Sequence, residues 1–204
     1  MVNQNKTCVV IILDKSGSML GLSSETISGY NNLLDEQQKL PGECTWTCVL
    51  FDDTHRTVDQ NVSVAEATKL SLANYKPSGY TALYDAIGDT VVDVGASLAA
   101  MKEKDRPGKV VFVVMTDGEE NRSREYSGKR IQDMIKHQRE KYNWEFVFMG
   151  CNEAAIKDAQ QNLSFGHSAS YTPSALGTKR LYNVVSQGLL STRSGKGWNS
   201  NDGG

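Results

Sequence analysis

The sequence predicts an α/β fold of the Rossmann-like, doubly wound type, in which a mainly parallel central sheet with one antiparallel edge strand carries helices on both faces. Runs rich in Val, Ile and Phe alternate along the chain with longer segments of helical period, which is the order of strands and crossover helices. Some of these runs are apolar throughout, as expected for parallel strands buried on both faces. A length of 204 residues suits one domain.

The first part of the chain predicts a central strand, a helix and a hairpin. The run TCVVIIL at 7–13 is continuously apolar, which is typical of a central parallel strand. The segment 24–40 predicts a helix that is terminated by Pro41 and Gly42. In 44–62 the run CTWTCVLF alternates, DDTHR forms a turn and TVDQNV follows, so we expect a hairpin with one strand at the sheet edge.

The middle of the chain predicts a loop, two helices and two strands. In 75–101 a loop containing Pro, Ser and Gly precedes apolar residues that are spaced as one face of a helix. The run at 109–118 predicts a second buried strand that again leads to an aspartate. The segment 127–142 predicts an amphipathic helix, and 144–150 predicts a third strand.

The last part predicts two further helices, at 152–163 and 172–190, and the stretch HSASY at 167–171 can form a short strand between them. The Gly- and Ser-rich composition of 195–204 is that of a flexible terminus. We therefore expect one domain over 1–194 and a flexible C-terminal tail after it.

Composition and charge narrow the class of protein. The apolar fraction of 39%, the charged fraction of 23% and the net charge of -2 are ordinary for a globular domain, and Lys and Arg form no basic block. We expect no nucleic-acid partner, since such partners require a basic patch or stripe. The first residues lack the order of a signal peptide and their apolar run is too short to span a bilayer, so we expect a cytoplasmic protein without a membrane partner.

The cysteines do not have the dense spacing of a disulfide framework. Two of them are four positions apart without a second pair or a nearby histidine, which gives a zinc site little support. We expect all four to be reduced and buried as small apolar residues: Cys8, Cys44, Cys48 and Cys151.

Oxygen-bearing side chains follow two of the predicted strands and one loop. Asp14, Ser16 and Ser18 follow the first strand at alternate positions, Thr81 stands where the loop meets its helix, and Asp117 follows the strand at 109–118. Ligands of open α/β sheets bind beyond the carboxyl ends of the strands, where these residues are expected to meet. Taken singly, each piece also has a simpler interpretation as a helix cap or a turn. The conjunction of all five favours a binding site.

The chemistry of these donors favours a hard divalent cation. Two carboxylates brought together without a cation repel each other and shift each other's pKa upward. Magnesium prefers octahedral oxygen ligands and keeps several waters, whereas calcium prefers more carboxylates and carbonyls, and zinc or copper prefers His or Cys. We expect Mg²⁺, with Mn²⁺ or Ca²⁺ as substitutes, and at least one coordination position open to an outside donor.

With these residues, the chain resembles the von Willebrand factor type A family, whose metal-ion-dependent adhesion site has the pattern Asp-x-Ser-x-Ser, then Thr, then Asp. The stretches DKSGS, GYTALYDAI and MTDGEEN carry the resemblance, and the order of strands agrees to about residue 194. The stretch FVFMGCNEAAIKDA is similar to a segment of stand-alone intracellular members from bacteria and their viruses. This implies a prokaryotic or phage protein of the same fold.

The resemblance also implies a role for each donor. Ser16 and Ser18 would bind Mg²⁺ directly, and Thr81 would bind it directly or through water. Asp14 and Asp117 would hold coordinated waters. A glutamate or aspartate of a partner protein would complete the octahedron.

Three neighbouring residues are candidates for the rim that a partner touches, namely Gly79, Tyr80 and Glu119. Tyrosine is enriched at interface hot spots, although Tyr80 is equally well explained as a half-buried loop aromatic. Glu119 and Glu120 would repel an acidic partner if they faced the metal, and a solvated surface position is the simpler interpretation.

Three functions remain open on the sequence alone. The leading one is a Mg²⁺-dependent protein-binding module without catalytic activity. The alternative is a structural or assembly component, in a phage or a multi-protein machine, with a structural metal. A phosphoryl-transfer enzyme of the haloacid dehalogenase type is disfavoured, because Ser16 replaces the acid expected two residues after the nucleophilic aspartate. The oligomeric state and the identity of the partner are not encoded in these motifs.

Overall fold

Six strands form one sheet in the order β3-β2-β1-β4-β5-β6 in the computed structural model, which describes residues 1–151 and 153–198. Only the β2–β3 pair at the edge is antiparallel, and the other four pairs are parallel. The strands are β1 (Asn3–Asp14), β2 (Glu43–Phe51), β3 (His55–Ser63), β4 (Pro107–Met115), β5 (Glu145–Gly150) and β6 (His167–Ser170). The predicted fold class is confirmed.

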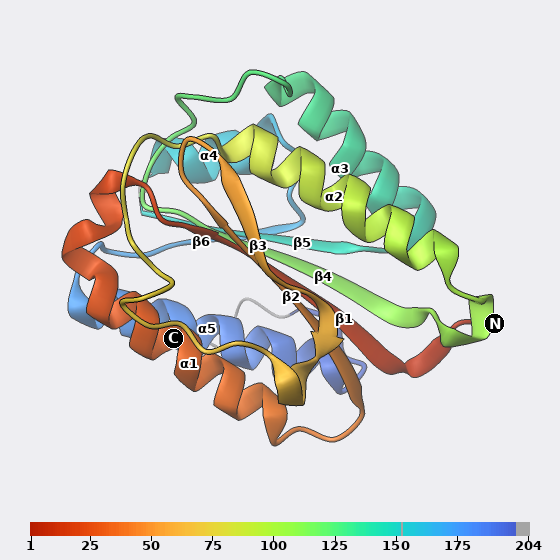
Figure 1. Ribbon diagram of the computed structural model, residues 1–204. Helices are drawn as coiled ribbons and strands as arrows, with labels where there is room; N and C mark the ends of the chain where they lie inside the picture. Colours follow the sequence, from red (N-terminus) through yellow and green to blue (C-terminus); the bar gives the residue numbers. More distant parts are fainter. Residues whose placement is uncertain (152, 199–204) are drawn as a thin grey trace.

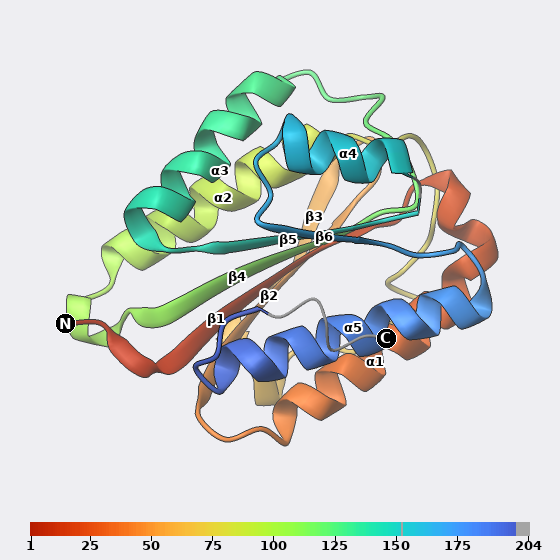
Figure 2. The same cartoon turned by 180° about the vertical axis from the view of Figure 1, so that it is seen from behind.

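Helices cover both faces of the sheet. Figures 1 and 2 show α1 and α5 together on one face and α2, α3 and α4 on the other. The helices are α1 (Ser23–Gln38), α2 (Leu83–Ala100), α3 (Gly128–Tyr142), α4 (Glu153–Gln161) and α5 (Ala175–Arg193), with short 3₁₀ helices at Gly17–Leu22, Val64–Glu66 and Glu103–Asp105. Each predicted helix and strand is present, with ends displaced by a few residues.

The central strand β1 is buried on both faces. Its odd-numbered residues Val9, Ile11 and Leu13 join the core that contains α1 and α5, whereas Val10 and Ile12 join the core beneath α2, α3 and α4. Because side chains alternate across a strand, only a continuously apolar sequence can satisfy both cores. The apolar run that predicted a central strand has this physical origin.

The sheet topology decides where a site can form. The connection from β1 through α1 leads to β2 on one side, and the connection from β3 through α2 leads to β4 on the other side. The strand order therefore reverses between β1 and β4, which makes their carboxyl ends a topological switch point. Leu13 is paired with Met115, so the residues that follow both strands leave the sheet side by side.

The C-terminal end of the chain packs more closely than its composition indicates. The predicted flexible tail begins at residue 195, but Trp198 is 7% exposed and its indole lies against Gly188 of α5. The packed part of the chain therefore extends at least to Trp198. Residues 199–204 of that tail, and residue 152 at the start of a predicted helix, lie outside the described residues.

Three of the four cysteines are buried as expected, and the fourth is not. Cys8, Cys44 and Cys48 are buried, and Cys151 is half-buried. Burial raises the pKa of the Cys8 and Cys44 thiols to about 11, so these side chains act as small apolar residues and not as nucleophiles. Within 1–151 and 153–198, no helix has the length and apolar character needed to cross a membrane.

The contact between α1 and α5 depends on Gly29, and this gives a first prediction. A Cβ atom at Gly29 would lie 2.1 Å from Cδ2 of Tyr182, whose ring is buried between the two helices. We expect Gly29→Ala to lower the free energy of unfolding by about 1–3 kcal/mol, because the ring must move in a packed core.

Gly95→Ala is the matched control, since its nearest neighbour is 4.0 Å away. It should be neutral or stabilising by up to about 1 kcal/mol. Equal stabilities of both variants in urea unfolding would contradict the packing described.

Candidate metal centre

The five predicted donors come together at the carboxyl ends of β1 and β4. Ser16 Oγ lies 3.1 Å from Ser18 Oγ, and Ser18 Oγ donates a hydrogen bond of 2.6 Å to Asp117 Oδ1. The Thr81 hydroxyl lies near that of Ser18, since both are next to Gly118. A Cβ atom built on Gly118 would lie 3.3 Å from Thr81 Oγ1 and 4.0 Å from Ser18 Oγ. Three segments that are distant in sequence thus place their oxygen atoms around one point.

Asp14 is held in a fixed position at the bottom of this cluster. Its Oδ1 accepts a hydrogen bond of 2.6 Å from the Ser16 amide, and its Oδ2 accepts one of 2.6 Å from Thr116 Oγ1. The Asp14 carbonyl accepts a further hydrogen bond from the buried Tyr75 hydroxyl at 2.7 Å. Asp14 itself is 0% exposed. The carboxylate therefore has little freedom to move toward any ligand outside the cluster.

The electrostatics of the two aspartates favour a cation. Burial raises the pKa of the Asp14 carboxyl to about 6, although hydrogen bonds from Thr116 and Ser16 lower it, and the nearby charge of Asp117 raises it further. Burial also raises the pKa of Asp117. Two carboxylates that resist ionisation in the same place are stabilised as anions by a positive charge between them.

The donor set fits a hard divalent cation. Cis ligands of an octahedron with Mg–O distances of about 2.1 Å are about 3 Å apart, and the hydroxyl oxygens of Ser16 and Ser18 have this separation. Because Ser18 directs its hydrogen to Asp117, its lone pairs stay available to a cation. In the part of the chain that the structure describes, no group of three His, Cys, Asp or Glu side chains could hold a metal. Candidate metal binding therefore depends on the hydroxyls.

The loop that carries Thr81 is docked on the loop after β1. Gly17 N donates to Gly79 O at 3.1 Å, and Ser78 N donates to Lys15 O at 2.8 Å. Gly79 has φ +71°, and a Cβ atom there would lie 1.9 Å from Asp53 Oδ2, so only glycine fits. Gly79 is exposed, and it fixes the path of the chain into Thr81, while its contact with a partner stays a prediction.

Asn121 is a positioning residue that the sequence analysis missed. Its side-chain Oδ1 accepts a hydrogen bond from the Thr81 backbone amide at 2.9 Å, and its backbone amide donates one to the Thr81 carbonyl at 3.1 Å. Asn121 thus holds the Thr81 backbone on both sides. Nothing in local sequence identifies this role, because the two residues are 40 positions apart.

The two glutamates after Asp117 point to different surroundings. Glu120 accepts hydrogen bonds from the amides of Tyr84, Arg122 and Ser123 at 2.9, 2.7 and 2.7 Å, and from the Ser123 hydroxyl at 2.6 Å. Its negative charge lies at the N-terminal end of α2, where the helix dipole stabilises it. Glu119 is exposed and forms no hydrogen bond or ion pair with the other described residues.

The remaining charges around the cluster are largely paired. Lys15, between Asp14 and Ser16 in sequence, forms an ion pair with Asp52. Partial burial raises the pKa of Asp52, but the Lys15 ammonium acts in the opposite direction, and this pKa lies below its usual value. Lys15 therefore does not occupy the place of a cation among the donors.

Tyr80 lies at the rim. Its side chain is 60% exposed, and the Arg122 guanidinium lies 5.4 Å from the centre of its ring. Asp53 joins the two residues, since it accepts from the Tyr80 amide at 3.2 Å and pairs with Arg122 Nε at 3.2 Å. The tyrosine is therefore an exposed aromatic on a braced loop, and its contact with a partner stays a prediction.

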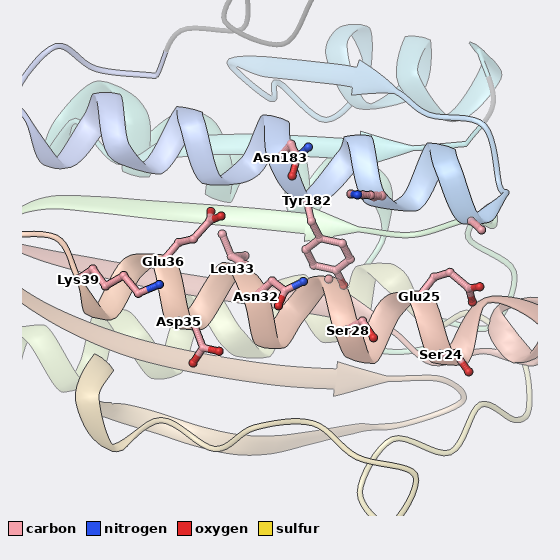
Figure 3. A pocket seen from close by; sticks show the side chains of 13 residues that line it. Ser24, Glu25, Ser28, Asn32, Leu33, Asp35, Glu36, Lys39, Tyr182 and Asn183 are labelled. Atoms are coloured by element: carbon pink, nitrogen blue, oxygen red, sulfur yellow. The ribbon is translucent and has the colours of Figure 1, made fainter.

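A separate groove of about 610 Å³ runs between α1 and α5, away from the donors. Figure 3 shows that it is lined by side chains such as Glu25, Asn32, Lys39 and Tyr182. The groove is mixed in charge and contains none of the five donors. The metal centre and this groove are thus different parts of the molecule.

Comparison with known proteins identifies the fold. No family model and no curated protein matches the sequence. Among solved structures, "von Willebrand factor type A from Catenulispora acidiphila" aligns over 91% of this chain and 43% of its own, with a TM-score of 0.63 and 14% identity. Proximal thread matrix protein 1 from the mussel byssus "with zinc occupied MIDAS motif" aligns over 90% and 46%, with a TM-score of 0.59 and 14% identity.

The pilus adhesin SpaC from Lactobacillus rhamnosus GG, in its open conformation, aligns over 93% of this chain and 30% of its own, with a TM-score of 0.67 and 13% identity. The chain spans less than half the length of each of these three proteins. The chain has the von Willebrand factor type A fold, as the resemblance implied.

The different surroundings of the two glutamates give a second prediction. We expect Glu120→Gln to lower the free energy of unfolding by about 1–3 kcal/mol, because the amide replaces a charged acceptor of several hydrogen bonds. Glu119→Gln makes the same chemical change one residue earlier, on a side chain that forms no hydrogen bond with the described residues. It should change the free energy of unfolding by no more than about 0.5 kcal/mol. Urea unfolding measures both. The assignment of Glu120 to the end of α2 is wrong if the two variants are equally stable.

Proposed function

We propose that this chain is a Mg²⁺-dependent protein-binding module that captures an acidic residue of a partner through an open coordination position. The observation that carries the proposal is the one-sided burial of the donor cluster. Asp14, Ser16 and Thr81 are 0%, 2% and 3% exposed, whereas Ser18 is exposed and Asp117 is half-exposed. A cation among them would be held from inside the protein and would face solvent on the other side.

The charge of the donor set explains why an acidic ligand would be preferred. Three of the five donors are neutral hydroxyls, and the two carboxylates together balance one divalent cation. Neutral hydroxyls are weak ligands, so the cation keeps a strong attraction for an anionic donor from outside. A charge-assisted bond of this kind gives specificity for aspartate or glutamate.

The similar structures support a metal at this place. The mussel protein is described with a zinc-occupied MIDAS motif, and SpaC is described as an adhesin. For the present chain we propose Mg²⁺ as the resident ion, with Mn²⁺ or Ca²⁺ as substitutes, because hydroxyl and carboxylate oxygens suit hard cations. Its chemical contribution would be to polarise and hold an outside carboxylate.

A binding role is better supported than a purely structural metal. Protein hydrogen bonds already join the three loops, through the pairs Gly17–Gly79, Lys15–Ser78 and Thr81–Asn121. Tyr75 also fixes the end of β1. Since the donors are positioned by these contacts, a metal is not needed to assemble the cluster.

The same geometry argues against phosphoryl transfer. A nucleophilic aspartate must reach the phosphorus atom of its substrate, but Asp14 is fully buried and both of its carboxylate oxygens accept hydrogen bonds. Ser16, two residues later, is not an acid that could protonate a leaving group at neutral pH. We therefore propose that the chain binds and does not catalyse.

The proposal is tested by selecting peptides from a random displayed library on the immobilised protein in Mg²⁺. We expect the enriched peptides to contain aspartate or glutamate, and to dissociate when the metal is chelated. Replacing the acid of a selected peptide with its amide should weaken binding at least tenfold, as expected for loss of a charge-assisted bond.

Variants separate the metal site from the rest of the surface. Ser16→Ala should abolish peptide binding while the protein stays folded by circular dichroism. Ser78→Ala, in the adjoining loop but outside the donor set, should retain it. Enrichment of peptides without an acid, or binding that persists in excess chelator, would refute the proposed function.

A further inference from the structure

A pocket of about 290 Å³ lies beside the metal centre, between the start of α2, the segment after β4, and α4. Four apolar residues of its lining are at most 8% exposed, namely Leu83, Phe148, Ala155 and Leu163, and the exposed Ala154 also lines it. Gly118 lines this pocket and also lies against Thr81 and Ser18 of the metal centre. The two sites therefore share one wall.

Three acidic residues also line the pocket: Glu119, Glu120 and Asp158. No Lys, Arg or His is among the described residues that line it. The Tyr84 hydroxyl points to Asp158 Oδ2 at 3.5 Å. Burial, followed by the charges of Asp158 and Glu120, raises the pKa of Tyr84 to about 12, which is consistent with a negative potential here.

None of these three carboxylates forms an ion pair with a cationic side chain among residues 1–151 and 153–198. Glu119 has no hydrogen bond or ion pair with the other described residues. Asp158 Oδ1 accepts from the Asn162 side-chain amide at 2.7 Å, which is a neutral donor. Glu120 accepts from backbone amides and from a serine hydroxyl, which are also neutral. The pocket is therefore complementary to a cation.

We propose that this pocket receives a lysine or arginine side chain from the same partner segment that presents an acidic residue to the metal centre. The proposal rests on the proposed function for the acidic residue. The aliphatic part of a lysine or arginine would lie on the apolar lining, and its charged end would reach the carboxylates. A wholly apolar side chain would displace water from the carboxylates without replacing the hydrogen bonds that the water makes, which is unfavourable.

The shared wall restricts the spacing of the two partner residues. Because Gly118 belongs to both sites, the acidic and the basic residue must lie close together along an extended segment. The partner is thus recognised by an acid and a base a few positions apart. This adds a second requirement to the metal-bound carboxylate.

The pocket is tested without metal, so that the outcome does not depend on the metal centre. The probes are n-butylguanidinium and its neutral analogue n-butylurea, titrated in chelator and followed by amide NMR shifts. We expect saturable shifts at Tyr84, Gly118 and Asp158 with the cation, and markedly weaker binding of the urea. Equal binding of both probes, or no saturable shift at these amides with the cation, would overturn the proposal.

Matched variants assign the effect to the pocket. Asp158→Asn keeps the size of a half-exposed side chain and should weaken n-butylguanidinium about threefold to fivefold, as expected for loss of one partly exposed charge. Asp133→Asn makes the same change on the exposed face of α3, outside this pocket, and should have no effect. If both variants weaken the probe equally, the binding is non-specific charge attraction and the proposal fails.

Acidic peptides with lysine or with norleucine near the acid then connect the two sites in Mg²⁺. We expect the lysine peptide to bind more tightly to the parent chain, and Asp158→Asn to reduce that preference. If neither peptide binds while n-butylguanidinium still does, the proposed metal function fails and the pocket stands. If both peptides bind equally, the link between pocket and partner is refuted.

Discussion

The arrangement of the molecule depends on the burial of one carboxylate at the end of one strand. β1 lies between β2 and β4 and is covered on both faces, so Asp14 leaves the sheet where water does not reach it. An anion there is unfavourable without compensation, and hydrogen bonds from Ser16 and Thr116 supply part of it. A divalent cation held with Asp117 would supply the rest. The structure thus shows compensation of this buried acid by hydrogen bonds, and a bound cation is the proposed addition to it.

The remaining contacts bring the other donors to that carboxylate. The reversal of strand order between β1 and β4 places two loops side by side, and the loop before α2 docks on the first of them. Gly79 permits the approach, and Asn121 fixes the backbone of Thr81. Rigid surroundings of this kind lower the entropy lost when a ligand binds. The open side of the cluster and the acidic pocket both border Gly118, so the two lie next to each other on the surface.

Much of the fold could be predicted from local patterns, and the five candidate donors chosen from such patterns lie close together in the structure. The apolar run of β1 follows from its burial on two faces, and the helical spacing of apolar residues in α2 follows from its burial on one face. The positioning residues could not be found in this way, because Asn121 meets Thr81 and Glu120 meets Tyr84 only after the chain has folded. The composition around Trp198 indicated a flexible tail, but Gly188 leaves room for its indole on α5. Such contacts depend on the three-dimensional placement of residues that no sequence period connects.

The open metal centre is tested most directly by the coordination of Mn²⁺ in the chelator-treated protein, measured by electron paramagnetic resonance with ¹⁷O-labelled water. We expect one tightly bound ion per chain that carries exchangeable water, and loss of part of this water when glutarate supplies a carboxylate. Asp117→Asn should lower the affinity of the protein for Mn²⁺. Absence of a tight site, or a coordination shell that glutarate does not alter, would contradict an open metal centre formed by these five side chains.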